Sequence, residues 1–284
     1  MSEDEKRLDE ATGEYTVGHS YDGIEELNTP LPRWWLWTFY ATIVWGIGYT
    51  IAYPAWPMIS GATAGVLGYS TRGAVAEDII EHEAQNAALV EELLSTELAA
   101  VDPASDLHRY AVARGSSVFT AQCSQCHGSG AAGAVGYPNL LDNAWLWGGS
   151  IDEIAYTVEH GIRNETSDAR WSEMPAFGEI LTSDEIATLV SHVQALPQGG
   201  AGELGEALYL DNCSACHGEQ GEGMPELGAP NIADAIWLYG GDEAALTETI
   251  TYSRFGVMPA MGLRLSDADI RAVSVYVHAL GGGE

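Results

Sequence analysis

The chain has 284 residues, 46 % of them hydrophobic, which is long and apolar enough to bury the cores of about two domains. Its 41 acidic residues against 11 basic ones give a formal net charge of −30 at pH 7. This charge excludes electrostatic binding to nucleic acid or to an anionic membrane surface. The negative charge is consistent with a basic binding partner. It is equally consistent with an acidic surface whose only role is to keep the protein soluble.

The first part of the chain, residues 1–33, is interpreted as a polar segment in the cytoplasm. Residues 1–28 contain no short apolar core and no small-residue cleavage site. We therefore expect no cleavable signal peptide.

An uncharged stretch of twenty residues, WWLWTFYATIVWGIGYTIAY, follows from Trp34 to Tyr53. At about 1.5 Å per residue, a helix of this length spans roughly 30 Å, the thickness of the hydrocarbon core of a bilayer. Tryptophan and tyrosine gather at both ends, as they do at membrane interfaces. The pattern predicts a transmembrane helix within residues 34–57, and a buried helix of a soluble core is the alternative.

Basic residues indicate how this helix would be oriented. Lys6, Arg7 and Arg33 precede it, whereas the first basic residue after it is Arg72. The positive-inside rule then places the N-terminus in the bacterial cytoplasm and the chain beyond about residue 58 in the periplasm. We expect a single-pass protein of the inner membrane.

Residues 58–106 are predicted to be a loop and a helical linker. The Gly-rich stretch 58–73 is interpreted as the loop. Apolar residues between Val75 and Leu94 recur at near-helical spacing, which predicts an amphipathic helix. We expect this helix to pack on the domain that follows rather than on a partner subunit.

The rest of the chain contains two similar segments, residues 107–197 and 203–284, joined by a short flexible linker. Each ends in a predicted helix, with Thr182 and Ser266 as the first residues of capping boxes. Few stretches resemble strands. The predicted fold is mainly α, with one N-terminal transmembrane helix followed by two tandem helical domains. The matched features are CSQCH and CSACH, Pro138-Asn139 and Pro230-Asn231, Trp145 and Trp237, Gly148-Gly149 and Gly240-Gly241, and Met174-Pro175-Ala176 and Met258-Pro259-Ala260.

All four cysteines lie in two Cys-x-x-Cys-His motifs, a pattern typical of covalent c-type haem attachment. Two thiols on one helical turn can bond to the two vinyl groups of the porphyrin, and the following histidine then faces the iron. The sequence therefore predicts two covalently bound haem c groups in two α-helical cytochrome c domains. The motif residues are Cys123, Cys126 and His127, and Cys213, Cys216 and His217.

Methionine is the usual second iron ligand in electron-carrying cytochromes. Met174 and Met258 stand in equivalent Met-Pro-Ala contexts, 47 and 41 residues after the motif histidines, and are the predicted ligands. Met261 competes with Met258, and Met224 is a weaker candidate because it lies only seven residues after its histidine. The sequence leaves open whether each methionine serves the haem of its own domain or of the other domain.

Four further residues have candidate roles near the haem groups. A backbone carbonyl at Pro138 and at Pro230 could accept the Nδ1–H of the motif histidine, and simple turns are the alternative. His192 and His278 occupy matched places in the two closing helices. They are interpreted as surface or packing residues, with bis-histidine ligation of the haem as the alternative.

Other chemistry for the cysteines fits less well. A redox-active dithiol would need a βαβ setting, which the pattern lacks. A closed zinc site would need four ligands, and each motif offers three adjacent ones with no later cysteine.

A segment YDGIEELNTPLPRWW, residues 21–35, stands before the uncharged stretch and the two motif-bearing domains. This arrangement resembles the dihaem subunit of cbb3-type cytochrome c oxidases, the CcoP or FixP family, over essentially the whole chain. The haem motifs fit many cytochromes, so the DGI-EL-N-P-PRWW pattern is the more specific part. The resemblance implies that His127, Met174, His217 and Met258 are the axial ligands of the two irons.

The resemblance also implies a function. The chain would be an electron-transfer subunit of a proton-translocating oxidase and would have no catalytic site of its own. Electrons would arrive from a donor cytochrome c, expected to be basic, and pass through a monohaem subunit to the haem–copper subunit that reduces dioxygen. Two alternatives stay open: a free membrane-anchored dihaem carrier serving several reductases, and a dihaem peroxidase, which would need an exchangeable iron ligand.

Overall fold

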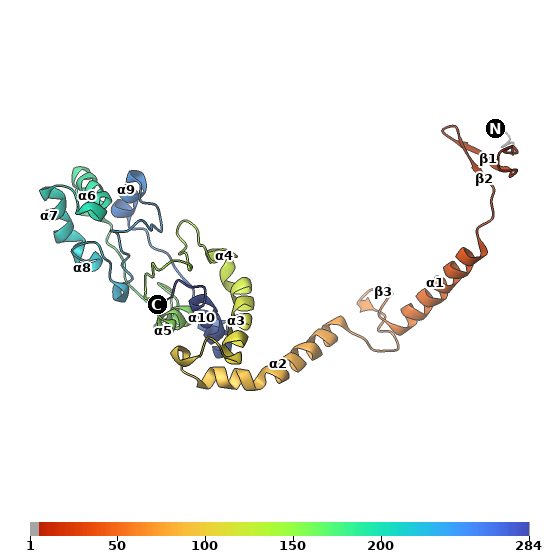
Figure 1. Ribbon diagram of the computed structural model, residues 1–284, viewed down its shortest axis with the longest axis horizontal. Coiled ribbons are helices and arrows are strands. Elements are labelled where there is room, and N and C mark those ends of the chain that lie inside the picture. The colour runs from red at the N-terminus through yellow and green to blue at the C-terminus, as the bar shows by residue number, and fades with distance from the viewer. Residues whose placement is uncertain (1–5, 284) are drawn as a thin grey trace. The chain divides into compact units, whose positions relative to one another are not determined.

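The computed structural model describes residues 6–283 and is mainly helical (Figure 1). The chain forms two compact units, one ending at Ala84 and the other beginning at Gln85. The helices are α1 (Arg33–Ala52), α2 (Thr71–Ser95), α3 (Asp106–Val118), α4 (Ser124–His127), α5 (Ile151–His160), α6 (Ser183–Ala195), α7 (Glu203–Asn212), α8 (Ser214–His217), α9 (Glu243–Tyr252) and α10 (Asp267–His278). The strands are β1 (Thr16–Tyr21), β2 (Ile24–Leu27), β3 (Pro57–Met58) and β4 (Gly61–Ala62).

The first unit begins with an antiparallel hairpin of β1 and β2, which the sequence analysis did not predict. Tyr21 pairs with Ile24 across the turn. Asp22 and Gly23 between them have φ angles of 51° and 87°, as the two central residues of a type I′ turn do. The Asp-Gly pair was therefore the signal for this hairpin.

Helix α1 covers most of the uncharged stretch. It begins after Pro32, it ends shortly before Pro54, and none of its residues is buried. Among residues 6–283, no helix combines the length and the apolarity that crossing a membrane requires. The transmembrane helix predicted for residues 34–57 is therefore not confirmed. A short hairpin of β3 and β4 follows α1 and replaces part of the predicted loop.

Helix α2 confirms the predicted helix, but only its C-terminal end packs on the domain that follows, since Val75, Ile79 and Ile80 are more than half exposed. It crosses from the first unit into the second, where Leu93 is fully buried in a cluster with Leu107 and residues of α10. Arg271 of α10 donates hydrogen bonds to the carbonyl oxygens of Leu93, at 2.7 Å, and of Thr96. The C-terminal end of α2 is therefore fixed to the second unit.

Two helical lobes form the second unit, and they do not follow the sequence repeats (Figure 1). Helix α3 of the first repeat packs on α10, the last helix of the second repeat. Helix α6, the last helix of the first repeat, packs on α7 and α9 of the second. We name α3, α4, α5 and α10 lobe A, and α6, α7, α8 and α9 lobe B. The repeats 107–197 and 203–284 each contribute helices to both lobes.

Small residues let the paired helices approach each other. A Cβ atom on Gly115 of α3 would lie 2.2 Å from the carbonyl oxygen of Ala272 on α10, so a side chain has no room there. Gly205 of α7 plays the same part against α6, because a Cβ atom there would lie 2.9 Å from the Cβ atom of His192. An ion pair between Arg114 and Asp269, with 2.8 Å from Nε to Oδ1, also joins α3 to α10.

Capping residues determine where several of these helices begin. Thr182 and Glu185 form the predicted capping box of α6, with both reciprocal hydrogen bonds present. Ser266 caps α10 as predicted. A third box, Ser150 with Glu153, starts α5 and was not predicted.

Candidate functional site

The two Cys-x-x-Cys-His motifs sit at the ends of matching helices. In lobe A a π-helical turn, Phe119–Cys123, leads from α3 into the short helix α4. In lobe B α7 leads directly into α8. Both short helices end at a glycine with positive φ, Gly128 or Gly218, where the chain turns away. Each motif histidine is therefore the last residue of its helix.

The two cysteines of each motif differ in their surroundings. Cys123 and Cys213 pack against the hydrophobic clusters of lobes A and B, whereas Cys126 and Cys216 are exposed. Burial raises the pKa of the Cys123 and Cys213 thiols to about 11, and the neighbouring cysteine adds to the shift. All four cysteines are unpaired thiols, so none is held in a disulfide.

One hydrogen bond orients each motif histidine. The Nδ1 atom of His127 lies 3.1 Å from the carbonyl oxygen of Pro138, and that of His217 lies 3.0 Å from Pro230. Because a carbonyl oxygen can only accept, Nδ1 carries the proton and Nε2 keeps its lone pair. Burial lowers the pKa of both imidazoles, although the carbonyl bond raises it, so the neutral form is favoured. The predicted role of the two proline carbonyls is confirmed.

Each predicted methionine packs beside the motif of the other repeat. Met258, from the second repeat, lies in the lobe A cluster together with Cys123 and Met261. Met174, from the first repeat, lies in the lobe B cluster together with Cys213. In lobe A the packing brings together Met258 and Cys123, which are more than 130 positions apart in the sequence. In lobe B it brings together Met174 and Cys213, which are about 40 positions apart.

Backbone hydrogen bonds hold the two methionine segments where they cross between the lobes. Met258 and Ile162 exchange a pair of bonds, with N to O distances of 3.0 and 2.9 Å. The side-chain amide of Asn164 also donates to the Met258 carbonyl oxygen, at 3.0 Å. In lobe B, the Ser253 hydroxyl donates to the carbonyl oxygen of Met174.

The competing candidates have different places. Met261 is buried in lobe A beside Met258, so both remain near Cys123. Met224 lies on a loop, where it exchanges backbone hydrogen bonds with Ala229. His192 is buried, which confirms a packing role, and its Nδ1 atom lies about 3 Å from backbone atoms of the linker.

Sequence reasoning missed an arginine beside the Met258 segment. Arg163 donates from Nε to the carbonyl oxygen of Ser172, at 2.6 Å, and from a terminal nitrogen to that of Gly256, at 3.1 Å. It therefore fastens the two crossing segments to each other. Its position three residues after the end of α5, in a chain with only 11 basic residues, was the signal for it in the sequence.

A second arginine that the sequence analysis did not select has an unused donor. The guanidinium carbon of Arg170 lies 4.9 Å from the centre of the Tyr156 ring and 5.6 Å from that of Trp147. Its Nε atom is buried and has no hydrogen-bond partner among the described residues. Burial lowers the pKa of this guanidinium, which still stays charged at neutral pH.

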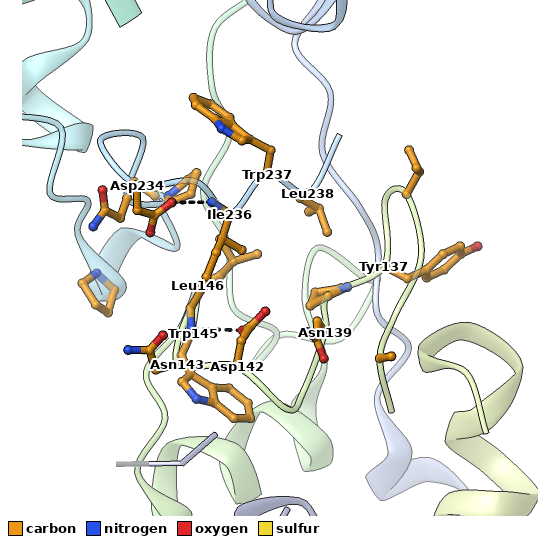
Figure 2. A pocket seen from close by; sticks show the side chains of 18 of the residues that line it. Tyr137, Asn139, Asp142, Asn143, Trp145, Leu146, Asp234, Ile236, Trp237 and Leu238 are labelled. Carbon is orange, nitrogen blue, oxygen red and sulfur yellow. Dashed lines mark hydrogen bonds between the residues drawn. The ribbon is translucent and has the colours of Figure 1, made fainter. Parts of the chain in front are cut away.

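Between the loops that follow the two motifs lies a cleft of about 440 Å³ (Figure 2). Residues 132–146 line one side and residues 222–238 the other. Pro138 and Pro230, whose carbonyl oxygens hold the motif histidines, both belong to its lining. The two histidine-supporting loops therefore face each other across this cleft.

Matching turns shape the two sides of the cleft. Asp142 accepts a hydrogen bond from the backbone N–H of Ala144, at 3.1 Å, and Asp234 accepts one from Ile236, at 2.8 Å (Figure 2). On the lobe A side the indole N–H of Trp145 donates to the Gly282 carbonyl oxygen. These turns fix the tryptophan-bearing loops that the two repeats share.

Both motifs fit a c-type haem. Each offers two thiols, a neutral histidine with a free Nε2 lone pair, and a thioether side chain in the same cluster. The buried Nε of Arg170 is a further donor that a haem carboxylate could use. Within residues 6–283, no group of three or more His, Cys, Asp or Glu side chains is arranged to hold a metal ion. Fold and site thus define a tandem cytochrome of the c type.

Comparison with known proteins identifies the family. Residues 13–60 match the family described as the N-terminal domain of cytochrome oxidase-cbb3, FixP. Residues 111–193 and 200–277 match the family described as cytochrome c oxidase, cbb3-type, subunit III.

Curated relatives agree over the full length. The chain is 56 % identical to the cbb3-type cytochrome c oxidase subunit CcoP of Cereibacter sphaeroides, over 95 % of both chains. It is 48 % identical to the subunit FixP of Bradyrhizobium diazoefficiens, over 99 % of both chains, and 46 % identical to FixP of Sinorhizobium medicae, over 100 % of both. The chain therefore belongs to the CcoP/FixP family of cbb3-type cytochrome c oxidase subunits, which are electron-transfer subunits of an oxidoreductase complex.

Proposed function

We propose that the chain carries two covalent haem c groups. One is bound through Cys123 and Cys126, the other through Cys213 and Cys216. Bound haem supplies reversible one-electron transfer at its iron. The support for two groups is that both motifs keep unpaired thiols and an oriented histidine.

The iron ligands are His127 with Met258 in lobe A, and His217 with Met174 in lobe B. The observation that carries this assignment is the packing of Met258 with Cys123 and of Met174 with the lobe B cluster. A thioether ligand leaves no open position on the iron and raises its reduction potential. This favours an electron carrier over a peroxidase.

Other residues of the chain hold the ligands and set their charge. The carbonyl oxygens of Pro138 and Pro230 keep the proton on Nδ1 and make the imidazole a better ligand. Arg170 would offer its buried Nε–H to a carboxylate of the bound haem. Its positive charge also stabilises the reduced state, which carries one more electron, and so raises the potential.

Helix α1 anchors the chain in the bacterial inner membrane, with the N-terminus in the cytoplasm and both lobes in the periplasm. No charged residue lies between Arg33 and Arg72, and no residue of α1 is buried within the chain. Covalent haem attachment through this motif takes place outside the bacterial cytoplasm, which agrees with this orientation.

The partners are the haem–copper catalytic subunit and the monohaem cytochrome c subunit of the oxidase, together with a basic donor cytochrome c. Support comes from the relatives, which match over nearly their whole length and bear the names of oxidase subunits. The alternative, a free membrane-anchored dihaem carrier, would have the same two haem sites but no fixed partner.

Purification of the tagged chain from native membranes in mild detergent tests this function. We expect haem b to copurify, together with cyanide-sensitive oxygen uptake driven by an artificial donor to cytochrome c. Two c-type haems alone, without oxygen uptake under conditions that keep other complexes intact, would show a free carrier instead.

A further inference from the structure

We propose that a small basic redox protein docks on lobe B, over a cleft beside Met174, and not on lobe A. This inference rests on the proposed function and adds to it the surface that receives the donor. It is carried by the charge of the two lobes and by an exposed aromatic surface on one of them.

Charge is distributed unevenly between the lobes. From Trp171 to Ser253, a range that contains all four helices of lobe B, the sequence has 14 acidic residues and no lysine or arginine. Every arginine of the second unit lies outside this range of the sequence. These are Arg109, Arg114, Arg163, Arg170, Arg254, Arg264 and Arg271.

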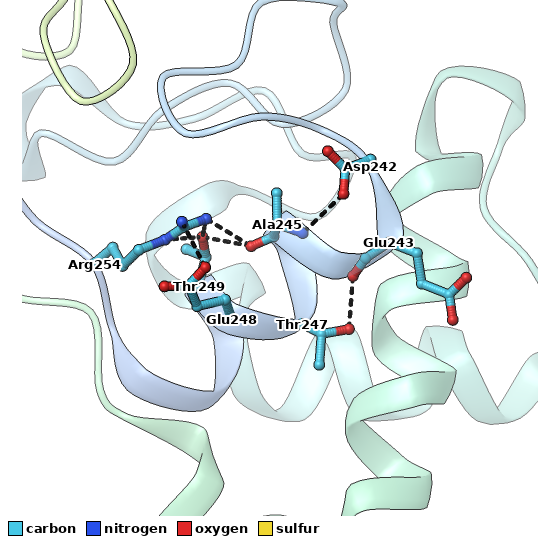
Figure 3. Close-up of polar contacts among 7 residues, drawn as sticks. All are labelled: Asp242, Glu243, Ala245, Thr247, Glu248, Thr249 and Arg254. Carbon is cyan, nitrogen blue, oxygen red and sulfur yellow. Dashed lines mark hydrogen bonds and ion pairs between the residues drawn. The ribbon is translucent and has the colours of Figure 1, made fainter.

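The one arginine that lies against a lobe B helix is already engaged (Figure 3). Arg254 follows the end of α9 and folds back on it. A terminal nitrogen lies 3.1 Å from Glu248, and the others donate to Thr249 and to the carbonyl oxygen of Ala245. Its guanidinium carbon also lies 4.8 Å from the centre of the Tyr239 ring. Its charge is therefore neutralised within α9.

An open cleft of about 410 Å³ lies beside the methionine of lobe B. Both aromatic residues that line it are exposed, Tyr252 at 73 % and Phe255 at 43 %. Large exposed aromatic side chains are typical of the centre of protein interfaces. The lining includes Glu173, Met174, Pro175, Ala176, Tyr252 and Phe255.

The equivalent segment in lobe A lacks these properties. The Met258 backbone is covered by Ile162 and by the side chain of Asn164. Arg170 pairs with Ile162 beside this segment, whereas Arg163 lies between the two methionine segments, with its guanidinium carbon 5.5 Å from the centre of the Phe255 ring. Because residues 171–253 contain no arginine or lysine, a basic partner is attracted more strongly by lobe B than by the surface around Met258.

Charge complementarity identifies the partner of the lobe B surface as a basic protein. The acidic lobe raises the rate of encounter at low ionic strength, because unlike charges steer diffusion over about a Debye length. The aromatic cleft then supplies the apolar contact that determines how long the complex lasts. An anionic partner or a phosphate ligand would meet net repulsion from this lobe.

The test uses the assembled oxidase in detergent and a basic mitochondrial cytochrome c as the probe. Association and dissociation rates are measured by surface plasmon resonance at low and high ionic strength. Glu173→Lys should slow association about fivefold at low ionic strength and have little effect at high ionic strength, and Glu173→Gln should have a smaller effect of the same kind. Tyr252→Ala should speed dissociation about fivefold at both ionic strengths.

Matched controls are Glu91→Lys on α2 and Leu263→Ala in lobe A, which change exposed residues by the same chemistry. We expect both controls to change the rates less than twofold. Equal effects of Glu173→Lys and Glu91→Lys would show that only total charge matters, and would overturn the proposal. So would loss of oxidase assembly in the Tyr252 variant, because the surface would then be a subunit interface. Absence of c-type haem from the unaltered chain would instead contradict the proposed function.

Discussion

Arg170 has an unusual environment for an arginine, since its Nε is buried without a partner while its plane lies against two aromatic rings. An orphaned buried donor is costly, and a bound carboxylate would satisfy it. The motif residues themselves could be predicted from the sequence, because the spacing of two thiols and a histidine is set by the chemistry of the porphyrin. The proline carbonyls could also be predicted, because they recur after both motifs. Arg170 could not be predicted, because it belongs to no repeated pattern.

Replacing Arg170 with Gln should lower the reduction potential of the lobe A haem. Removing one positive charge from a partly screened site costs the reduced state about 1 kcal/mol, which corresponds to ~40 mV for one electron. Redox titration followed in the visible spectrum measures the shift. Arg109→Gln is the control, because Arg109 is exposed and forms its ion pair with Asp106 on the same helix. Equal potentials in the Arg170 variant and in the unaltered chain would contradict the proposed role.

At the scale of single elements, the pairing of α3 with α10 holds lobe A together. The capping boxes of α6 and α10 could be predicted from a serine or threonine three residues before an acidic residue. The hairpin of β1 and β2 was missed, although Asp22-Gly23 signals it. The partner of α3 could not be predicted, because apolar periodicity shows which face of a helix is buried but not which helix covers it.

The ion pair between Arg114 and Asp269 should make the stability of lobe A decrease at acidic pH. Burial raises the pKa of Asp269, but hydrogen bonds from Ser266 and Arg114 outweigh it and lower the pKa below the ordinary value of 3.8. A carboxyl group whose pKa is lower in the folded state than in the unfolded state stabilises the folded state. This stabilisation is complete at pH values above the unfolded-state pKa, and it is lost as the pH falls through the folded-state pKa. Asp269→Asn should therefore cost about 1–2 kcal/mol at neutral pH.

Chemical denaturation at pH 7 and near pH 3 measures this effect. The difference between Asp269→Asn and the unaltered chain should shrink at the lower pH, because that pH lies below the unfolded-state pKa of 3.8 and closer to the depressed folded-state pKa. Asp267→Asn is a nearby control that removes the same charge at the start of the same helix. An equal loss in both variants would mean that the helix dipole, and not the ion pair, is responsible.

Gly115 provides a separate test of the α3–α10 contact. Gly115→Val would place a side chain against the Ala272 carbonyl oxygen, and overpacking of this kind costs about 1–3 kcal/mol. Gly130→Val is the control, since nothing lies within 4 Å of a Cβ atom there. Thermal unfolding should show a lower midpoint for the Gly115 variant alone. An unchanged midpoint would mean that the two helices do not approach so closely.

At the scale of the whole molecule, the two repeats exchange their C-terminal parts, so that each lobe is built from both. The sequence predicts two similar domains, and repeated motifs make that prediction secure. It cannot predict the exchange, because a methionine loop and closing helix from either repeat present nearly the same apolar face to either lobe. Contacts that hold the crossing segments, such as Ile162 with Met258, decide the arrangement and have no signature in the sequence.

The exchange of methionines between lobes is tested most directly in a chain that keeps one haem. Replacing Cys213 and Cys216 with alanine removes the lobe B attachment site, so that the remaining haem signal belongs to His127. On this background Met258→His should abolish the methionine-to-iron charge-transfer band and lower the reduction potential, whereas Met174→His should change neither. The opposite result, loss of the band in the Met174 variant alone, would show that each repeat serves its own haem and would contradict the crossed arrangement.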